Sequence, residues 1–209
     1  IWPIVQQQIN LEINMKIDIK TNIKEVTKDL SKTQKKQIPF ATANAINTTL
    51  FQLRKEMGKQ TVKKLDNPTP FTQKGFMVTK ASKLKLFGEL FIKEAVAKYL
   101  NFQIEGGVRS NSKKFAIPTR NAKLNQYGNI PGKKSGVVKG KKQSIMTING
   151  MTGVYEKHKD NTLKLIIAFK DSANYKIKFP FYKIGEGFIN NKFNKNMIVA
   201  LNKALKSAK

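Results

Sequence analysis

Residues 39–65 read PFATANAINTTLFQLRKEMGKQTVKKL and decide the first half of the fold. Proline suits the first turn of a helix, and apolar residues then recur at spacings of three and four, which places them on one helical face. The series is Ala43, Ile46, Leu50, Leu53 and Met57. The pattern predicts a helix that begins at Pro39 and continues through Val62 and Leu65. The run 67–70, with two prolines, ends it.

The segments on either side of this helix predict short elements. Alternating apolar and charged residues over 15–20 predict a half-buried strand, and a short helix is expected from there to about residue 36. Residues 1–14, ahead of Met15, are expected to lie outside the core fold. Downstream, 76–79 and 84–93 are predicted strands, with Gly88 as a candidate bulge. Residues 95–102 fit either a short helix or a strand.

The C-terminal part predicts a small antiparallel sheet followed by a helix. Strands are expected at 144–148, 153–158, 163–169 and 175–179, and Asn149-Gly150 and Asp160-Asn161 supply turn chemistry between the first three. An amphipathic pattern over 181–205 then predicts a closing helix. The expected fold is α+β, one domain in which both long helices pack on antiparallel strands. Its parts are 15–105 and 143–209, separated by the stretch 106–142.

The bulk composition points to an acidic or anionic partner. The 209 residues include 40 Lys and Arg against 13 Asp and Glu, a formal net charge of +27. Such a charge destabilises a compact monomer by self-repulsion, so a neutralising partner is expected. Nucleic acid is the commonest, an anionic membrane surface comes second and an acidic protein neighbour third. Cysteine is absent, and no apolar run is long enough to anchor the chain in a membrane.

Most of the candidate contact residues lie in one acid-free stretch. Between Glu105 and Glu156 there is no Asp or Glu, and residues 106–142 combine cations with glycine and proline. Such a run resists packing and predicts a basic loop or arm inserted between strands. It could follow a phosphate backbone or dock on an acidic subunit. The candidate contacts are Arg109, Lys113, Lys114, Arg120, Lys123, Lys133, Lys134, Lys139, Lys141 and Lys142.

Catalytic chemistry finds little support in the sequence. The single histidine, His158, lies in a turn context with no carboxylate placed to orient it, and the acids are scattered. The run 128–135 is superficially similar to a phosphate-binding loop, but it is one residue short and Lys134 stands where Ser or Thr should hold a metal. We therefore predict a protein that is not an enzyme, with no catalytic residues, no metal and no cofactor.

Four stretches, in matching order, resemble one family of tailed-bacteriophage proteins, the minor tail protein Z or tail completion proteins. Residues 36–49 (KQIPFATANAINTT) resemble the opening helix of that family, and 67–72 (NPTPFT) the break after it. Residues 121–131 (NAKLNQYGNIP) resemble a loop of the same proteins, and 179–184 (FPFYKI) the lead into their last helix. The likeness spans roughly residues 16 to 209.

The resemblance implies a structural virion protein of the neck, where connector and tail join around the DNA channel. It implies portal or connector and tail-tube or other tail proteins as partners, self-association into a ring, and non-specific contact with packaged DNA. The expected location is the head–tail interface or tail of a virion, after synthesis in the cytoplasm of a bacterial host. The alternative is a freestanding basic protein that binds nucleic acid through the phosphate backbone without sequence specificity.

Overall fold

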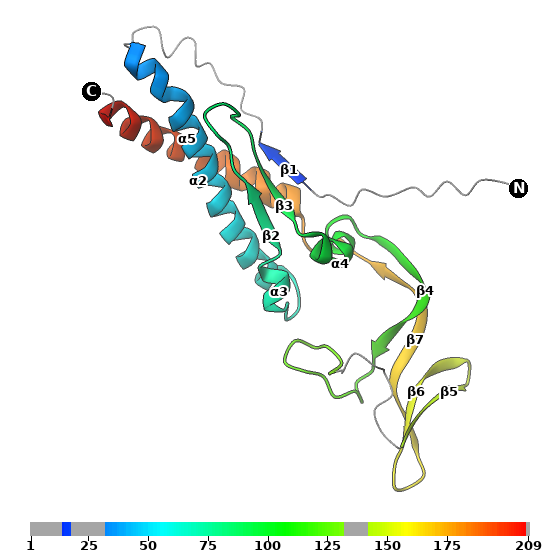
Figure 1. Cartoon of the computed structure of the whole chain (residues 1–209). Coiled ribbons are helices and arrows are strands. Elements are labelled where there is room, and N and C mark those ends of the chain that lie inside the picture. Colours follow the sequence, from blue (N-terminus) through cyan, green and yellow to red (C-terminus); the bar gives the residue numbers. More distant parts are fainter. Residues whose placement is uncertain (1–13, 18–31, 132–141, 208–209) are drawn as a thin grey trace, which may run out of the picture.

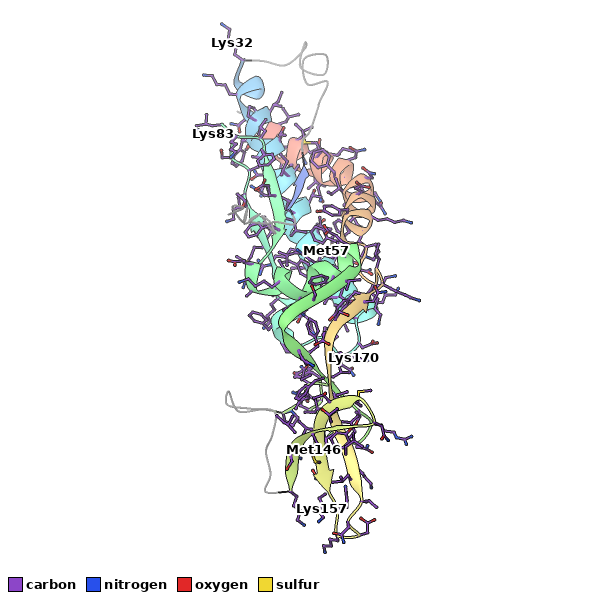
Figure 2. All side chains as sticks on the ribbon, turned by 90° about the vertical axis from the view of Figure 1, so that its right-hand side faces the viewer. Lys32, Met57, Lys83, Met146, Lys157 and Lys170 are labelled. Carbon is purple, nitrogen blue, oxygen red and sulfur yellow. The ribbon has the colours of Figure 1, made fainter. Side chains whose placement is uncertain are left out.

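The computed structural model describes residues 14–17, 32–131 and 142–207. The described chain is elongated: a helical body lies at one end, and a β ribbon extends from it (Figure 1). Seen from the side, Met57 lies in the body, whereas Met146 and Lys157 lie in the opposite end of the molecule (Figure 2). Helices and antiparallel sheets are combined in one chain, so the predicted α+β class is confirmed.

Two long helices form the spine of the body. Helix α2 (Lys32–Lys64) and helix α5 (Phe181–Ser207) run antiparallel and pack along each other (Figure 1). Asn196 of α5 links them, because its Nδ2 donates to Thr49 Oγ1 at 2.9 Å and to Gln52 Oε1 at 3.0 Å. The predicted apolar face of α2 is buried from Ala43 to Met57, whereas Val62, where the pattern predicts that it continues, is exposed; the closing helix is confirmed.

Helix α2 begins earlier than its sequence pattern predicts. It starts at Lys32 rather than Pro39, so Pro39 lies inside the helix and forfeits one backbone hydrogen bond. Burial of Ile38 and Ala41 on either side of the proline offsets that loss. Three buried threonines also belong to the inner face, and each hydroxyl donates to the carbonyl four residues earlier at 2.7–2.9 Å. They are Thr42, Thr49 and Thr61.

A three-stranded antiparallel sheet packs on the helices in the order β1-β3-β2. Its strands are β1 (Asn14–Ile17), β2 (Phe76–Thr79) and β3 (Gly88–Ile92), and β2 is confirmed to the residue. Gly88 forms no bulge and instead opens β3. A Cβ atom there would lie 2.5 Å from Leu50 Cδ1, so the strand approaches α2 this closely only with glycine.

Two shorter helices complete the body. Helix α3 (Pro70–Gln73) follows the predicted break, and the hydroxyl of its N-cap Thr69 accepts a hydrogen bond from the Thr72 amide. Helix α4 (Glu94–Glu105) resolves the open choice at 95–102 in favour of helix. The rest of the predicted strand at 15–20 lies outside the described residues, as does most of 1–14. The predicted short helix lies outside them up to residue 31, and its last part, 32–36, is continuous with α2 and forms no separate helix.

The core of the body is centred on three phenylalanines. Phe76, Phe179 and Phe181 are fully buried, with ring centroids 6.0–6.4 Å apart. Phe179 is fixed because its amide and that of Lys178 both donate to the Gln103 carbonyl of α4. Burying one such side chain stabilises a fold by about 1.5–3 kcal/mol. The aromatic cluster therefore fastens the start of α5 to the small sheet.

The β ribbon is a four-stranded antiparallel sheet in the order β4-β7-β6-β5. Its strands are β4 (Gly107–Pro118), β5 (Gln143–Ile148), β6 (Met151–Lys157) and β7 (Leu163–Tyr175). Asn149 and Gly150 have φ of 50° and 76°, as a tight hairpin turn requires, and Asn161 has φ of 62° in the next turn. Three predicted strands and both turns are confirmed.

Two predictions for this region are wrong. Residues 175–179 form no separate strand, because β7 continues to Tyr175 and pairs there with Gly107. Residues 106–142 are not one loop, because 107–118 forms β4, which pairs with β7 at both of its ends around a register shift between Ser110 and Phe115. Alternating apolar residues such as Phe115 and Ile117 allow this half of the basic stretch to join a sheet. The inserted segment between β4 and β5 starts only at Thr119.

Candidate partner interface

The ten predicted contact residues do not form one described surface. Arg109, Lys113 and Lys114 lie on β4, Arg120 and Lys123 lie in the loop 119–131, and Lys142 precedes β5. The remaining four lie outside the described residues: Lys133, Lys134, Lys139 and Lys141. The described cations are therefore spread over a strand, a loop and the base of a hairpin.

Arg109 is held by packing at the base of the ribbon. Its guanidinium carbon lies 5.6 Å from the ring centre of Phe102 on α4 and 5.2 Å from that of Phe115 on β4. Both distances allow an attraction between the cation and the ring faces. The half-buried Arg109 thus joins α4 to the ribbon, and it is not displayed on a free loop as the sequence suggested.

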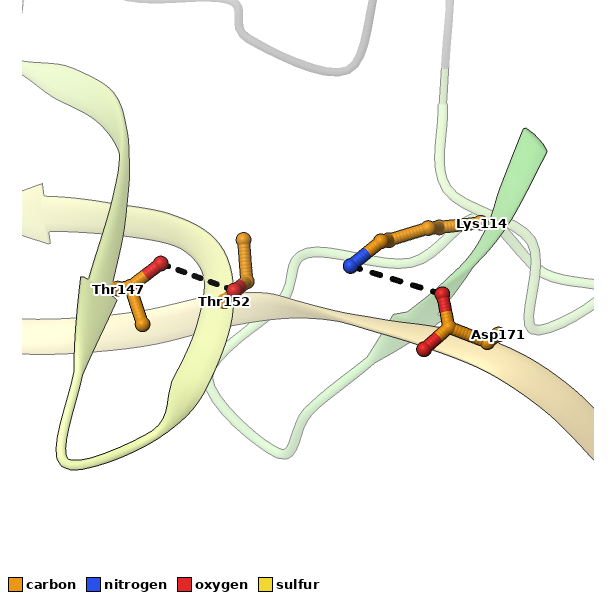
Figure 3. Close-up of polar contacts among 4 residues, drawn as sticks. All are labelled: Lys114, Thr147, Thr152 and Asp171. Atoms are coloured by element: carbon orange, nitrogen blue, oxygen red, sulfur yellow. Dashed lines mark hydrogen bonds and ion pairs between the residues drawn. The ribbon is translucent and has the colours of Figure 1, made fainter. Parts of the chain in front are cut away.

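Lys114 meets an acid from another strand. Its Nζ lies 3.5 Å from Asp171 Oδ1 on β7 (Figure 3), and both side chains are exposed. An exposed pair of this kind contributes little to stability. It does lower the positive charge of the ribbon locally. Farther along the same sheet, the hydroxyls of Thr147 and Thr152 pair across β5 and β6 at 2.9 Å (Figure 3).

The loop 119–131 has a defined conformation that presents Arg120 and Lys123 to solvent. Thr119 Oγ1 donates to the Leu165 carbonyl at 2.6 Å and ties the start of the loop to β7. Asn125 Oδ1 accepts the amides of Tyr127 at 2.9 Å and Asn129 at 3.0 Å, and Gly128 takes a φ of 72°. These local bonds form an Asx turn. Both cations are exposed on the resulting loop.

At the hairpin base, cations and acids are mixed. A shallow hollow of about 510 Å³ is lined by Lys142, Lys157 and Lys159 together with Glu156, His158 and Asp160. Thr162 donates its hydroxyl (2.7 Å) and its amide (3.1 Å) to Asp160 Oδ1, which holds the pKa of that carboxyl below its ordinary value. Gln143 donates to Glu156 at 2.6 Å. Both acids are thus engaged by neighbouring polar groups.

The acid-free character of the basic stretch is therefore partly lost on folding. Asp171 and Glu156 lie outside 106–155 in sequence, yet in the folded sheet Asp171 pairs with Lys114, and Glu156 lines the same hollow as Lys142. The sequence could not predict these neighbours, because they depend on the pairing of β4 with β7, where the register shifts between Ser110 and Phe115, and on the pairing of β5 with β6.

A second hollow joins segments that the sequence singled out separately. It measures about 560 Å³ and lies between the turn after α2, helix α4, the end of β7 and the loop 119–131. Two of the four family-like stretches contribute to its lining, 67–72 and 121–131, and a third, 179–184, begins one residue after the lining residue Lys178. Asp66 and Lys178 pair across its rim at 3.3 Å. Its aromatic lining is Tyr99, Tyr127 and Tyr175.

No local sequence signal could have found this hollow, because its lining comes from four separate parts of the chain. One residue of its lining, Gln103, is notable. The side-chain oxygen of Gln103 is buried and has no hydrogen-bond partner among the described residues. Tyr99, by contrast, exchanges a 2.8 Å hydrogen bond with Thr72. The hollow thus combines tyrosine rings with amide and hydroxyl groups on a surface that links body and loop.

Groups suited to metal chemistry were sought over the same residues. Within 14–17, 32–131 and 142–207, no three His, Asp or Glu side chains gather where they could hold a metal ion. In that part of the chain, no helix has the length and apolar character that crossing a membrane requires. No protein-family model matches the sequence, and neither curated proteins nor solved structures give a significant match.

Proposed function

We propose that this chain is a structural virion protein of a tailed bacteriophage, a tail completion or neck component that joins connector to tail. It would self-associate into a ring around the DNA channel and contact portal or connector subunits on one side and tail proteins on the other. The order of four family-like stretches along the chain supports the proposal, and so does the meeting of two of them, 67–72 and 121–131, in the lining of one hollow.

The observation that carries the proposal is the ribbon that extends from the body. Its two long strands, β4 and β7, pair with each other, and β7 also carries the β5–β6 hairpin, which lies away from the helices (Figure 1). The ribbon leaves apolar side chains in solvent, including Ile145, Met151 and Leu163. Exposed apolar groups on a projecting sheet are typical of a surface that a neighbouring subunit covers. A projection of this kind suits a protein that reaches an adjacent ring.

Charge supports an assembly role in a confined, anionic setting. A ring of copies multiplies the net charge of +27, and packaged DNA or acidic neighbours would neutralise it. Arg120, Lys123 and Lys142 are exposed on the loop and hairpin, and no ion pair of theirs is found among the described residues. These three are the predicted contact residues that we assign to such contacts.

The alternative function, nucleic-acid binding by a freestanding protein, is favoured by the charge alone. Binding that reads bases in single strands needs exposed aromatic rings. In the basic stretch, Phe115 lies against Arg109, and Tyr127 lines the hollow between α4 and the loop 119–131. Neither is a free stacking surface, so any nucleic-acid contact would go to the phosphate backbone.

The test compares two sets of charge-neutralising substitutions in the phage that encodes the chain. One variant carries Arg120→Gln, Lys123→Gln and Lys142→Gln, and a control removes the same charge from exposed α5 positions with Lys192→Gln, Lys195→Gln and Lys203→Gln. Electron microscopy of lysates then counts joined particles against separate heads and tails. We expect the loop and hairpin variant to leave heads and tails separate and the control to assemble.

Two outcomes would contradict the proposal. If purified particles do not contain the protein at all, it is no virion component. If the protein instead binds duplex DNA with an affinity that falls steeply and linearly with the logarithm of salt concentration, and particles assemble without it, the nucleic-acid alternative holds. Equal failure of both variants would assign the defect to net charge and overturn the role of the loop and hairpin.

A further inference from the structure

A groove on the body, remote from the ribbon, combines apolar and cationic side chains. It has a volume of about 580 Å³ and lies where the outer side of α2 meets α3 and the start of β2. Gly58 lies at the closest approach, because a Cβ there would be only 3.2 Å from the Gln73 carbonyl. Gln73 is itself fixed by a 2.9 Å bond from its side chain to the Pro68 carbonyl. The close approach of the α2 and α3 backbones at Gly58 and Gln73 therefore forms the floor on which the groove side chains stand.

The apolar part of the groove follows an exposed stripe on α2. Phe40, Phe51 and Val62 recur every eleven residues, a spacing that keeps them on nearly the same side of a helix. Their exposed fractions are 52%, 36% and 53%, although the opposite side of α2 is fully buried. Phe51 and Val62 line the groove and are about 16 Å apart along the helix. Aligned apolar residues in solvent are typical of an interaction surface.

The charged part of the groove is wholly positive. Its lining includes Arg54, Lys55, Lys59 and Lys74 and contains no acid, and Lys80 lies 5.6 Å from the Phe51 ring centre at the margin. Among the described residues, none of these cations forms an ion pair. The nearest acid on the helix, Glu56, lines a different hollow and accepts a hydrogen bond from Gln60. A ligand with carboxylates therefore finds free partners there.

We infer that this groove binds an acidic, apolar segment of another protein, presented as a short amphipathic helix. Leucine or phenylalanine side chains would cover Phe51 and Val62, and glutamates or aspartates would pair with the surrounding cations, in the manner of helix-in-groove recognition. A partner of about three helical turns matches the 16 Å between the two apolar groups. Duplex DNA would satisfy the cations but offers no apolar group to the stripe. The inference does not depend on the proposed virion function.

The test measures binding of a defined probe by fluorescence anisotropy. The probe is a labelled synthetic peptide of about three helical turns, with glutamates on one side and leucine and phenylalanine at helical spacing on the other. One comparison peptide replaces its apolar residues with serine, and a labelled DNA duplex serves as a third probe. The protein variants are Lys55→Glu with Lys59→Glu, Val62→Ser, and the control Lys192→Glu with Lys195→Glu, which makes the same charge change on α5.

We expect the groove charge variant and Val62→Ser each to weaken peptide binding by about tenfold, because each removes contacts between the groove lining and the peptide. The α5 control should bind as the unaltered protein does, and the serine peptide should bind more weakly. All substituted side chains are exposed, so circular dichroism should find each variant folded. If the serine peptide or the duplex binds the groove as tightly as the apolar probe, the site is a general polyanion surface and the inference is wrong. Equal weakening by the α5 control would overturn it as well.

Discussion

At the scale of single residues, two glycines differ in the space around them: Gly153 has no room for a Cβ atom, and Gly187 has. A Cβ on Gly153 of β6 would lie 2.2 Å from the Ile167 carbonyl and 2.6 Å from Leu165 Cδ1. The carbonyl belongs to the paired strand β7 and cannot move away without disturbing the sheet. Gly153→Ala should therefore lower the free energy of unfolding by about 1–3 kcal/mol, measured by urea denaturation followed by circular dichroism.

Gly187 of α5 provides the matched control. A Cβ there meets nothing within 4 Å, and glycine inside a helix costs stability relative to alanine. Gly187→Ala should raise the free energy of unfolding by about 0.5–1 kcal/mol. Unchanged stability of Gly153→Ala would show that the pairing of β6 with β7 is wrong.

The lowered pKa of the Asp160 carboxyl predicts that the stability of the turn between β6 and β7 depends on pH. The pKa of Asp160 is lowered because Thr162 donates its hydroxyl and its amide to the ionised form. A lowered pKa in the folded protein means that the stabilising contribution is present above the pKa of the unfolded chain. That contribution is lost as pH falls through the folded value. NMR titration of the carboxyl carbon should find Asp160 titrating below an ordinary aspartate.

Thr162→Val removes the first of these donors and leaves the shape of the side chain nearly unchanged. The pKa of Asp160 should then rise towards its ordinary value, because the hydroxyl bond is the largest cause of the shift. Identical titration curves in the two proteins would mean that the Thr162 hydroxyl does not face Asp160.

At the scale of elements, the junction between α4 and the ribbon depends on Arg109. Its guanidinium lies against the rings of Phe102 and Phe115, one on each element. Arg109→Ala should lower the free energy of unfolding by about 1 kcal/mol, and Arg109→Lys should recover only part, because an ammonium lacks the planar surface that stacks on a ring.

The control for this junction is Arg120, which is exposed in the loop 119–131. Arg120→Ala should change stability by less than about 0.5 kcal/mol. Thermal and urea unfolding of both variants would check the pair. If both alanine variants behave alike, Arg109 has no special part in holding the ribbon to the body.

Elements also differ in how well the sequence foretold them. Strand β2 and helix α5 follow from short-range pattern, since alternation and three-to-four spacing are properties of the segment itself. The start of α2 and the length of β4 do not follow from short-range pattern. A proline marks a preferred helix start and a glycine-rich basic run marks a preferred loop. In this fold, burial of Ile38 and Ala41 and pairing with β7 override those preferences.

At the scale of the whole molecule, stability should be unequal between body and ribbon. The body holds a continuous core that includes Phe76, Leu90 and Phe181, whereas the buried apolar residues of the four-stranded sheet are Val154, Tyr155, Ile167 and Ala168. Regions with less buried apolar surface open locally at lower free energy than the whole molecule. Native-state hydrogen exchange should therefore find β5 and β6 amides exchanging through an opening of lower free energy than α2 amides.

The measurement is amide exchange at increasing low concentrations of denaturant. With increasing denaturant, the opening free energies of α2 amides should converge on the free energy of global unfolding. Those of β5 and β6 amides should converge on a separate, lower value. A partner that covers the ribbon should slow its exchange more than that of the body. Coincident behaviour of all amides would show a single cooperative unit and contradict the division.

The sequence by itself determined most of helix α2, helix α5, most strands, both tight turns, the α+β class and the excess of positive charge, because periodicity, turn chemistry and composition act over a few neighbouring residues. Tertiary structure alone decided where that charge ends up. Folding pairs Asp171 with Lys114, places Glu156 and Lys142 around one hollow, and sets Arg109 against the rings of Phe102 and Phe115. The tertiary structure also brings separate segments together to form the hollow around Tyr127 and the groove beside Phe51. Contacts between residues far apart in the chain depend on packing, which no local pattern encodes.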